Sequence, residues 1–462
     1  MTAVSSFWDF SSVEDENVIA IVSESGLEVS YGDLFCDVEK YILDNLFSHE
    51  RSLVLLKVRN SYLSIVSYLA CLKNKSPFII ISDDLDDELY LDMLDRYNPN
   101  LIIENGVTYK NCEFKHNIHP SIAMMLSTSG STGSPKLVKL TYDNIISNAS
   151  SIVEYLKICN NDSAITSLPM SYSYGLSIIN SHLLAQGKII VSNYSLLDSK
   201  FWELMSTHKV TSISGVPFTY QLLKKIHYNR LDTSNVRYLT QAGGALDSET
   251  LRYFSNVCSE KKQEFYVMYG QTEASPRISY LPPESLSSKL GSIGVPVPGG
   301  TMYLIDEFGT QICSPNFEGE IVYTGANVMA GYALNSSDFS TEPCINMELK
   351  TGDLGYFDSD GYFYITGRKK RFVKIFGVRV SLDSIDKWLS MNNIPAVTVS
   401  NGEIIHFVFE SCSSSIVDNT IIDFVRTFKV KATSTRVSIV DKLPRHSNGK
   451  VDFKLLNPLI YK

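Results

Sequence analysis

The hydrophobic residues of the N-terminal half follow two different periods. The runs RSLVLLKV (51–58) and SPFIIIS (76–82) are typical of buried strands, and the segment between them has the spacing of a helix. Further strand-like runs follow at 188–192, 209–217 and 236–244, with helical patterns between them. Strands that alternate with helices in this way predict an α/β fold with mainly parallel, layered sheets.

Two further segments refine this picture. Residues 83–95 are acidic but carry apolar residues at helical spacing, which predicts a solvated amphipathic helix. From Gly291 on, short strands are separated by glycines, which predicts a small antiparallel, β-barrel-like region. After it the pattern changes to a small α+β segment. We therefore expect a large domain at 1–368, a small domain at 369–462, and a hinge at 368–371.

Composition excludes several classes of protein. The chain has 462 residues and a net charge of −9, which argues against a nucleic-acid partner. The charge is uneven: residues 369–462 hold ten Lys and five Arg against eight Asp and Glu, a net +7, so the remainder carries −16. No apolar run is long enough to span a membrane, the first ten residues do not predict a secretory signal, and the eight cysteines show no CxxC spacing. We expect a cytoplasmic protein without a membrane partner.

The segment STSGSTGSPK (127–136) is the first candidate for chemistry. Its small residues fit either a flexible linker or a loop that binds an anion. It lies between two apolar runs, which favours a strand–loop–strand clamp with free N–H groups, hydroxyls and the ammonium of Lys136. The spacing required for a P-loop is absent, because Pro135 precedes the lysine and Leu137 follows it.

The segment Thr128–Lys136 resembles the phosphate loop of the adenylate-forming superfamily, which comprises acyl- and aryl-CoA synthetases, nonribosomal peptide adenylation domains and luciferases. Other motifs of that superfamily follow in the same order: AGGAL (242–246), YGQTE (269–273), TGD (351–353), GRKKRFVKIFG (367–377) and LPRHSNGK (443–450). The chain is identified as a member of this superfamily over nearly its whole length.

The resemblance implies ATP and Mg²⁺ as cofactors and assigns roles to named residues. The residues implied to bind ATP or AMP are Thr128, Ser129, Gly130, Ser131, Thr132, Gly133, Lys136, Gly243, Gly244, Ala245, Tyr269, Gly270, Thr272, Asp353 and Arg368. Lys450, Thr272 and Glu273 are implied to be catalytic, with Glu273 as the Mg²⁺ ligand. Lys370 is implied to be the hinge about which a mobile small domain turns.

The implied reaction joins a carboxylate to the α-phosphorus of ATP, releases pyrophosphate, and passes the acyl group to a thiol. The acid pocket is implied to include Tyr172, Ser173, Gly175, Val216, Gly244 and Tyr269. Members that activate amino acids usually have an aspartate where this chain has Ser173. An uncharged hydroxyl would not compensate a buried ammonium, so we expect a small acid without an α-amino group.

The thiol acceptor is left open between two partners. CoA ligases often read GKxxR at the last motif, whereas this chain continues from Lys450 to Val451 and Asp452. This favours the phosphopantetheine of an acyl carrier protein over free CoA. A third interpretation is a non-catalytic protein that binds an adenylate, which the presence of Lys450 and Glu273 argues against.

Overall fold

The fold was obtained as a computed structural model of the 462-residue chain. It describes residues 6–10, 13–46, 51–127, 136–342, 347–369, 371–375, 378–401, 404–428, 430–445, 451–453, 455 and 456.

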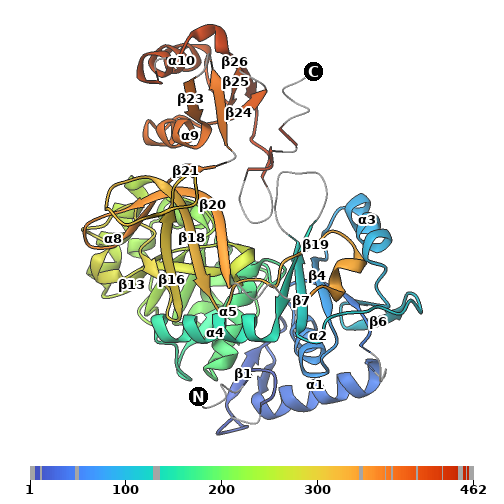
Figure 1. The fold of residues 1–462 in the computed structure, drawn as a ribbon. Coiled ribbons are helices and arrows are strands. Elements are labelled where there is room, and N and C mark those ends of the chain that lie inside the picture. The colour runs from blue at the N-terminus through green and yellow to red at the C-terminus, as the bar shows by residue number, and fades with distance from the viewer. Residues whose placement is uncertain are drawn as a thin grey trace.

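Two large sheets form the body of the molecule (Figure 1). Among the described residues the first sheet runs in the order β15 (Val295–Pro296), β14 (Arg277–Leu281), β13 (Glu264–Gly270), β12 (Tyr238–Gln241), β11 (Ser212–Gly215), β9 (Ser163–Ile165), β10 (Lys188–Ile190), β1 (Ile19–Val22), β2 (Glu28–Ser30). The second runs β19 (Tyr332–Ala333), β8 (Leu137–Thr141), β7 (Ile122–Ser127), β4 (Phe78–Ser82), β3 (Val54–Val58), β5 (Leu101–Glu104), β6 (Val107–Lys110).

The strands are almost continuously apolar because both faces of each sheet are covered. Ile189 contributes to the central core, whereas its neighbour Ile190 packs on the opposite face. Leu56 and Leu55 divide in the same way in the second sheet. The helices that supply residues to the central core are α1 (Tyr31–Asn45), α2 (Tyr62–Lys73), α4 (Tyr142–Leu156) and α5 (Ser173–Leu184). The outer faces are covered by α6 (Ser199–Thr207), α7 (Pro217–Lys225) and α8 (Ser248–Lys261) on the first sheet and α3 (Asp87–Tyr97) on the second.

The pairing of strands agrees with the α/β prediction and qualifies it. Strands β9 to β13 are parallel to one another, as are β3, β4, β5 and β7, whereas the strands at the edges beyond β13, β5 and β7 pair antiparallel. The expected acidic helix is present, but it begins at Asp87 rather than near Asp83. Its start is fixed by Asp86, whose side chain accepts hydrogen bonds from the N–H groups of Glu88 and Leu89.

The glycine-rich region forms the antiparallel sheet that the sequence predicts. Its described strands run in the order β17 (Gln311–Ile312), β16 (Gly300–Ile305), β18 (Gly319–Gly325), β20 (Glu348–Phe357), β21 (Phe363–Arg368). Strand β21 ends at the junction with the C-terminal part of the chain.

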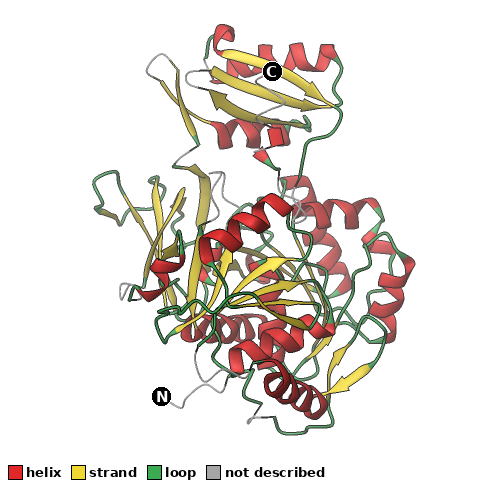
Figure 2. Ribbon diagram, turned by 90° about the vertical axis from the view of Figure 1, so that its right-hand side faces the viewer, coloured by secondary structure: helices red, strands yellow, loops and turns green. Residues whose placement is uncertain are grey.

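The C-terminal part is an α+β unit with its own hydrophobic clusters, whose buried members all lie at Val373 or beyond. Its elements are β22 (Phe372–Ile375), β23 (Val378–Ser381), α9 (Leu382–Met391), β24 (Ala396–Asn401), β25 (Ile404–Glu410), α10 (Ser414–Phe428) and β26 (Thr435–Val440). The unit stands apart from the body in both views (Figures 1 and 2). On this ground we propose the domain division at 368–371.

Ion pairs connect the segments on the two sides of the junction. Arg371 forms ion pairs with Asp383 and Asp386 of α9, and Asp383 also accepts a hydrogen bond from the backbone N–H of Arg368. The ammonium of Lys369 lies 2.7 Å from a carboxylate oxygen of Glu320 in the body. No helix in the described ranges is both long enough and apolar enough to cross a membrane.

Candidate active site

The candidate site lies at the carboxyl ends of parallel strands in the first sheet. Val216 follows β11, Gly243 follows β12, and Thr272 follows β13, and these three strands are adjacent and parallel. The loop after the next strand, β9, leads into α5 at Ser173. Loops at the carboxyl edge of a parallel sheet are free to converge on a ligand, and ligands commonly bind there.

Gly243, which is implied to bind the nucleotide, lies against two of the predicted acid-pocket residues, Tyr172 and Val216. Its backbone has φ +87°, a left-handed conformation that favours glycine. A Cβ added at this position would lie 2.8 Å from the hydroxyl of Tyr172 and 3.2 Å from Cγ1 of Val216. The structure therefore brings Tyr172, Val216 and Gly243 together, and it needs glycine at 243 to do so. Gly244 and Ala245 follow as exposed residues.

Ser173 and Thr272 meet at the entrance to α5. The Ser173 hydroxyl is buried and lies 3.5 Å from the hydroxyl of Thr272. Gly175 has a packing role in the same place, because a Cβ there would lie 2.2 Å from the carbonyl oxygen of Pro169. Ser173 is thus close to a residue with an implied phosphate contact, and it supplies no charge.

Asp353 is a buried carboxylate held by several donors. It lies in β20, is 4% exposed, and accepts hydrogen bonds from the hydroxyl of Tyr269 and from Nε2 of Gln271 at 2.9 Å. Nε of Arg368, on the neighbouring strand β21, lies 3.3 Å from its other oxygen. Burial raises the pKa of Asp353, and Arg368, Tyr269 and Gln271 only partly oppose that effect. Burial and the adjacent Asp353 together raise the pKa of Tyr269 well above its usual value.

Lys136, Tyr332 and Glu273 form a second cluster. Tyr332 is on β19, which pairs with β8 and so lies beside the start of that strand at Leu137. The Tyr332 hydroxyl donates a 2.8 Å hydrogen bond to Oε1 of Glu273, and the ammonium of Lys136 lies 3.6 Å from the centre of the Tyr332 ring. Burial and the Glu273 carboxylate raise the pKa of Tyr332. One aromatic residue therefore contacts a cation and a carboxylate that both have implied roles at the phosphates.

The segment Tyr269–Glu273 connects the two clusters. Tyr269 contacts Asp353 at one end, Glu273 contacts Tyr332 at the other, and Thr272 between them meets Ser173. Several residues with predicted roles lie outside the described residues: Thr128, Ser129, Gly130, Ser131, Thr132, Gly133, Lys370 and Lys450.

The sequence interpretation missed Gln271 and Tyr332. Nε2 of Gln271 also donates to the carbonyl oxygen of Thr351 at 3.0 Å, so this amide fixes the strand that carries Asp353. Gln271 lies inside the quoted motif YGQTE and Tyr332 lies in none of the quoted motifs, and the contacts of both residues join segments that are distant in the sequence. Only the strand pairing could have located them.

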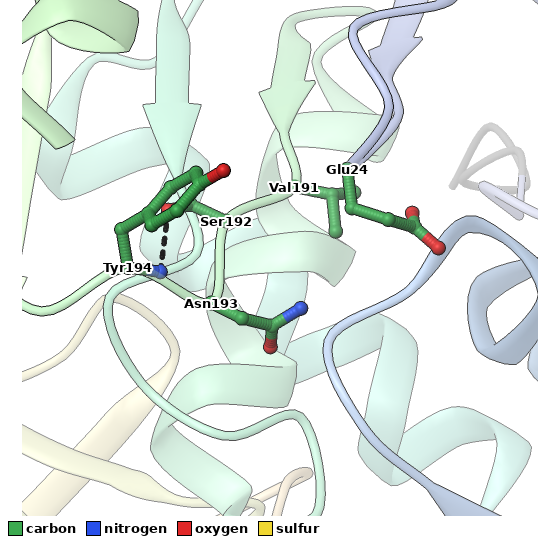
Figure 3. Close-up of a pocket in the computed structure, with 5 residues that line it drawn as sticks. All are labelled: Glu24, Val191, Ser192, Asn193 and Tyr194. Atoms are coloured by element: carbon green, nitrogen blue, oxygen red, sulfur yellow. Dashed lines mark hydrogen bonds between the residues drawn. The ribbon is translucent and has the colours of Figure 1, made fainter. Parts of the chain in front are cut away.

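A pocket of about 200 Å³ lies elsewhere, at the carboxyl end of β10 (Figure 3). It is lined by Glu24, Val191, Ser192, Asn193 and Tyr194. Two of its polar side chains are engaged within the fold: Asn193 donates to the carbonyl oxygen of Asn60, and Glu24 accepts from the N–H of Tyr62. It contains none of the predicted site residues.

The residues present fit a Mg²⁺ ion shared with phosphates. No group of three His, Cys, Asp or Glu side chains that could enclose a metal occurs in the described part of the chain. Glu273 offers a carboxylate whose Oε2 accepts no hydrogen bond from another described residue, and Oε1 alone is engaged by Tyr332. Mg²⁺ is commonly held by one or two carboxylates together with substrate phosphates, so a single available carboxylate suits it.

Comparison with known proteins identifies the family of the chain. The profile of the AMP-binding enzyme family matches residues 12–333. An oxalate–CoA ligase of Arabidopsis thaliana is 28% identical over 351 residues, covering 72% of this chain and 66% of that protein. A 2-succinylbenzoate–CoA ligase of Bacillus subtilis (strain 168) is 28% identical over 341 residues, covering 71% of this chain and 67% of that protein. The chain thus spans about two-thirds of the length of these curated relatives.

Solved structures show the same fold. The o-succinylbenzoate CoA synthetase MenE of Bacillus subtilis, in complex with its acyl-adenylate, superposes with a TM-score of 0.80 at 22% identity, covering 97% of both chains. The same enzyme with ATP and a magnesium ion gives a TM-score of 0.79 at 22% identity, covering 97% of this chain and 98% of that chain. The protein belongs to the AMP-binding enzyme family. The predicted superfamily and fold class are confirmed.

Proposed function

We propose that this protein activates a small carboxylic acid with ATP, releases pyrophosphate, and transfers the acyl group to a thiol. One observation carries this proposal: the segment Tyr269–Glu273 contacts the buried carboxylate Asp353 on one side and the Lys136–Tyr332 pair on the other. A nucleotide needs both kinds of group, because its ribose offers hydroxyl donors and its phosphates carry negative charge.

The nucleoside end is assigned to Asp353, Tyr269 and Arg368. A carboxylate can accept hydrogen bonds from both ribose hydroxyls, and burial limits competition from water at Asp353. The ring of Tyr269 offers a flat face to adenine. Arg368 is mostly exposed and free to approach a phosphate while it stays near Asp353.

The phosphate end is assigned to Thr272, Lys136 and the loop that precedes Lys136. When bound, Mg²⁺ would be held by Glu273 and would neutralise charge on the phosphates. Two anions must meet in the reaction, so the contribution of the protein is chiefly alignment and charge neutralisation. Lys450 is assigned to the meeting point of the acid carboxylate and the α-phosphate.

The acid is assigned to the space around Gly243, Tyr172 and Val216. Ser173, which points at Thr272, offers no negative charge, so we propose an acid without an α-amino group. Its reacting carboxylate belongs near Thr272, where the α-phosphate is also expected. Gly244 and Tyr269 complete the proposed pocket.

CoA is the thiol acceptor that we propose. The relatives compared above are named as CoA ligases. The residues after Lys450, Val451 and Asp452, favoured a carrier protein over the GKxxR pattern of CoA ligases, and a carrier protein remains the alternative. The basic charge of 369–462 suits either acceptor because both are anionic. The free thiols of the described cysteines support a cytoplasmic location as part of the proposal.

Acid-dependent exchange of labelled pyrophosphate into ATP tests the first step. Exchange with aryl or acyl acids and not with amino acids is the expected result. Lys450→Ala should lower the exchange rate by at least about a hundredfold, whereas Lys442→Ala, in the same terminal segment, should leave it unchanged. A Lys450→Ala variant that exchanges normally would favour a non-catalytic adenylate-binding protein. Supplying CoA and carrier protein separately then identifies the acceptor.

A further inference from the structure

Arg277 is a buried cation beside the proposed acid pocket. It is the first residue of β14 and is 3% exposed. It pairs across the sheet with Gly270, which directly precedes Gln271 and Thr272. A Cβ on Gly270 would lie 1.7 Å from the carbonyl oxygen of Pro276, so glycine keeps the two strands in close contact here. This places Arg277 next to the segment that carries the proposed phosphate contacts.

The neighbours of the guanidinium are aromatic rings that lead to the pocket. Cζ of Arg277 lies 4.2 Å from the centre of the Tyr174 ring. The Tyr174 ring meets the Tyr172 ring edge-on, with 6.2 Å between their centres, and the Tyr172 hydroxyl lies at Gly243. Burial raises the pKa of Tyr172 and Tyr174, and the charge of Arg277 opposes that effect in both. The guanidinium therefore acts electrostatically on the residue that borders Gly243.

The Arg277 guanidinium shares a hydrogen bond with the neutral side chain of Tyr155, but its charge has no counter-ion within the described residues, and its Nε–H has no acceptor there. Other arginines of the body differ. Arg237 forms a 2.7 Å ion pair with Asp162. Arg51 also has an Nε without an acceptor, but its terminal nitrogens donate to two backbone carbonyls. Buried arginines are normally paired, because an isolated buried charge is unfavourable. Arg277 is thus suited to an anionic partner from outside the chain.

We propose that Arg277 binds a second carboxylate of the acid, so that the substrate is a dicarboxylic acid activated at its other end. This inference rests on the proposed function, since it names the class of acid. A guanidinium can present two parallel N–H groups to the two oxygens of a carboxylate, and an Nε–H without an acceptor is available for one of them. The uncharged Ser173 and the buried Arg277 together select an acid that is anionic at both ends.

Matched pairs of acids test the inference in the pyrophosphate exchange assay. The probes are malonate, succinate, glutarate and adipate, each compared with its monomethyl ester, beside a set of aryl and acyl monocarboxylic acids. The wild-type chain should show a kcat/KM at least about a hundredfold higher for one diacid than for its half-ester, because the half-ester leaves the guanidinium unpaired.

Three variants separate recognition from folding. Arg277→Met should abolish the preference by lowering kcat/KM for the diacid without lowering it for the half-ester. Arg277→Lys keeps the charge but not the two parallel N–H donors, so it should retain part of the preference for the diacid. Arg51→Met removes an arginine with backbone partners and should keep the full preference. Thermal unfolding checks that each variant folds, and the wild-type ratio together with Arg277→Lys decides the case if Arg277→Met does not fold.

The outcomes distinguish the two proposals. If the wild-type chain activates half-esters or simple monocarboxylic acids as well as any diacid, the role of Arg277 is overturned and the ligase function stands. The same holds if Arg277→Met lowers kcat/KM equally for all acids. If no acid supports exchange, the proposed function itself fails, and the inference about Arg277 fails with it.

Discussion

Tyr332 and Glu273 are joined by a hydrogen bond of 2.8 Å, while the ring of the same tyrosine faces the ammonium of Lys136. The two contacts use different parts of one side chain, so they can be removed separately. Tyr332→Phe deletes the bond to Glu273 and keeps the ring, whereas Tyr332→Leu deletes both contacts.

Tyr332→Phe should raise the KM for ATP and the Mg²⁺ requirement by about tenfold in pyrophosphate exchange, which corresponds to one charge-assisted hydrogen bond. Tyr332→Leu should have a larger effect because the cation–π contact with Lys136 is lost as well. Tyr303→Phe is the control, since Tyr303 bonds an exposed carboxylate, Glu348, away from the site. Equal kinetics for the wild type and Tyr332→Phe would show that the bond has no part in nucleotide binding.

Asp353→Asn should weaken ATP binding without weakening the fold. Burial raises the pKa of Asp353, so the ionised form is unfavourable in the folded state. The raised pKa contributes to the free energy of unfolding. That contribution is fully present below the ordinary pKa of an aspartate, and it is lost as the pH rises through the raised pKa of Asp353 in the folded state. At pH 7 the amide removes that penalty. We expect a Tm equal to or above that of the wild type, together with a KM for ATP at least about tenfold higher. A lower Tm with an unchanged KM contradicts this account.

Gly243→Ala should disturb the acid pocket. The alanine would have to keep the left-handed backbone conformation of Gly243, and its methyl group would lie 2.8 Å from the hydroxyl of Tyr172. We expect the free energy of unfolding to fall by about 1 kcal/mol. We also expect the KM for the acid to be higher than that of the wild type, since Tyr172 has to move. Gly309→Ala is the matched control: its φ of +85° is also left-handed, but a Cβ there would meet nothing within 4 Å, and it lies outside the site. A KM for the acid that changes equally in both variants would argue against a pocket at Gly243.

The stability of the body should fall in mild acid because of His182. Burial lowers its pKa to about 4 from an ordinary value of 6.5. The unfolded chain therefore binds a proton in this range that the folded chain does not. The free energy of unfolding should fall by up to about 3 kcal/mol for this group as the pH drops from 6.5 to 4. Chemical denaturation at several pH values should show a shallower dependence for His182→Gln, and an identical slope would exclude His182 as the cause.

The sequence predicted the fold well where patterns are local. Alternating apolar runs and helical patterns located β3, α2 and β4. The short strands separated by glycines from Gly291 on located the antiparallel region. The start of α3 was placed too early, because a run of acidic residues hides which one caps the helix. Asp86 was recognisable as the cap only once its side chain could be seen to bond the first turn.

Only part of the candidate site could be predicted in this way. Motifs indicated Tyr269, Glu273 and Asp353, but they did not indicate that Gln271 links two of these residues. Arg277 and Tyr332 were missed because their contacts depend on strand pairing and on packing against α5. A polar residue in a short strand usually faces solvent, so nothing local marked Arg277 as buried.

The carboxylate of Asp383 contacts both sides of the junction between β21 and the C-terminal unit. It accepts the backbone N–H of Arg368, the last residue of β21, and it also pairs with Arg371 at the start of the C-terminal unit. Any rotation of the chain between these residues has to break the first bond, whereas the second can travel with α9. The energy needed to leave the observed orientation is therefore concentrated in a few polar contacts, including the ion pair of Lys369 with Glu320. Because ion pairs are screened by salt, the rate of such a rotation should increase with ionic strength.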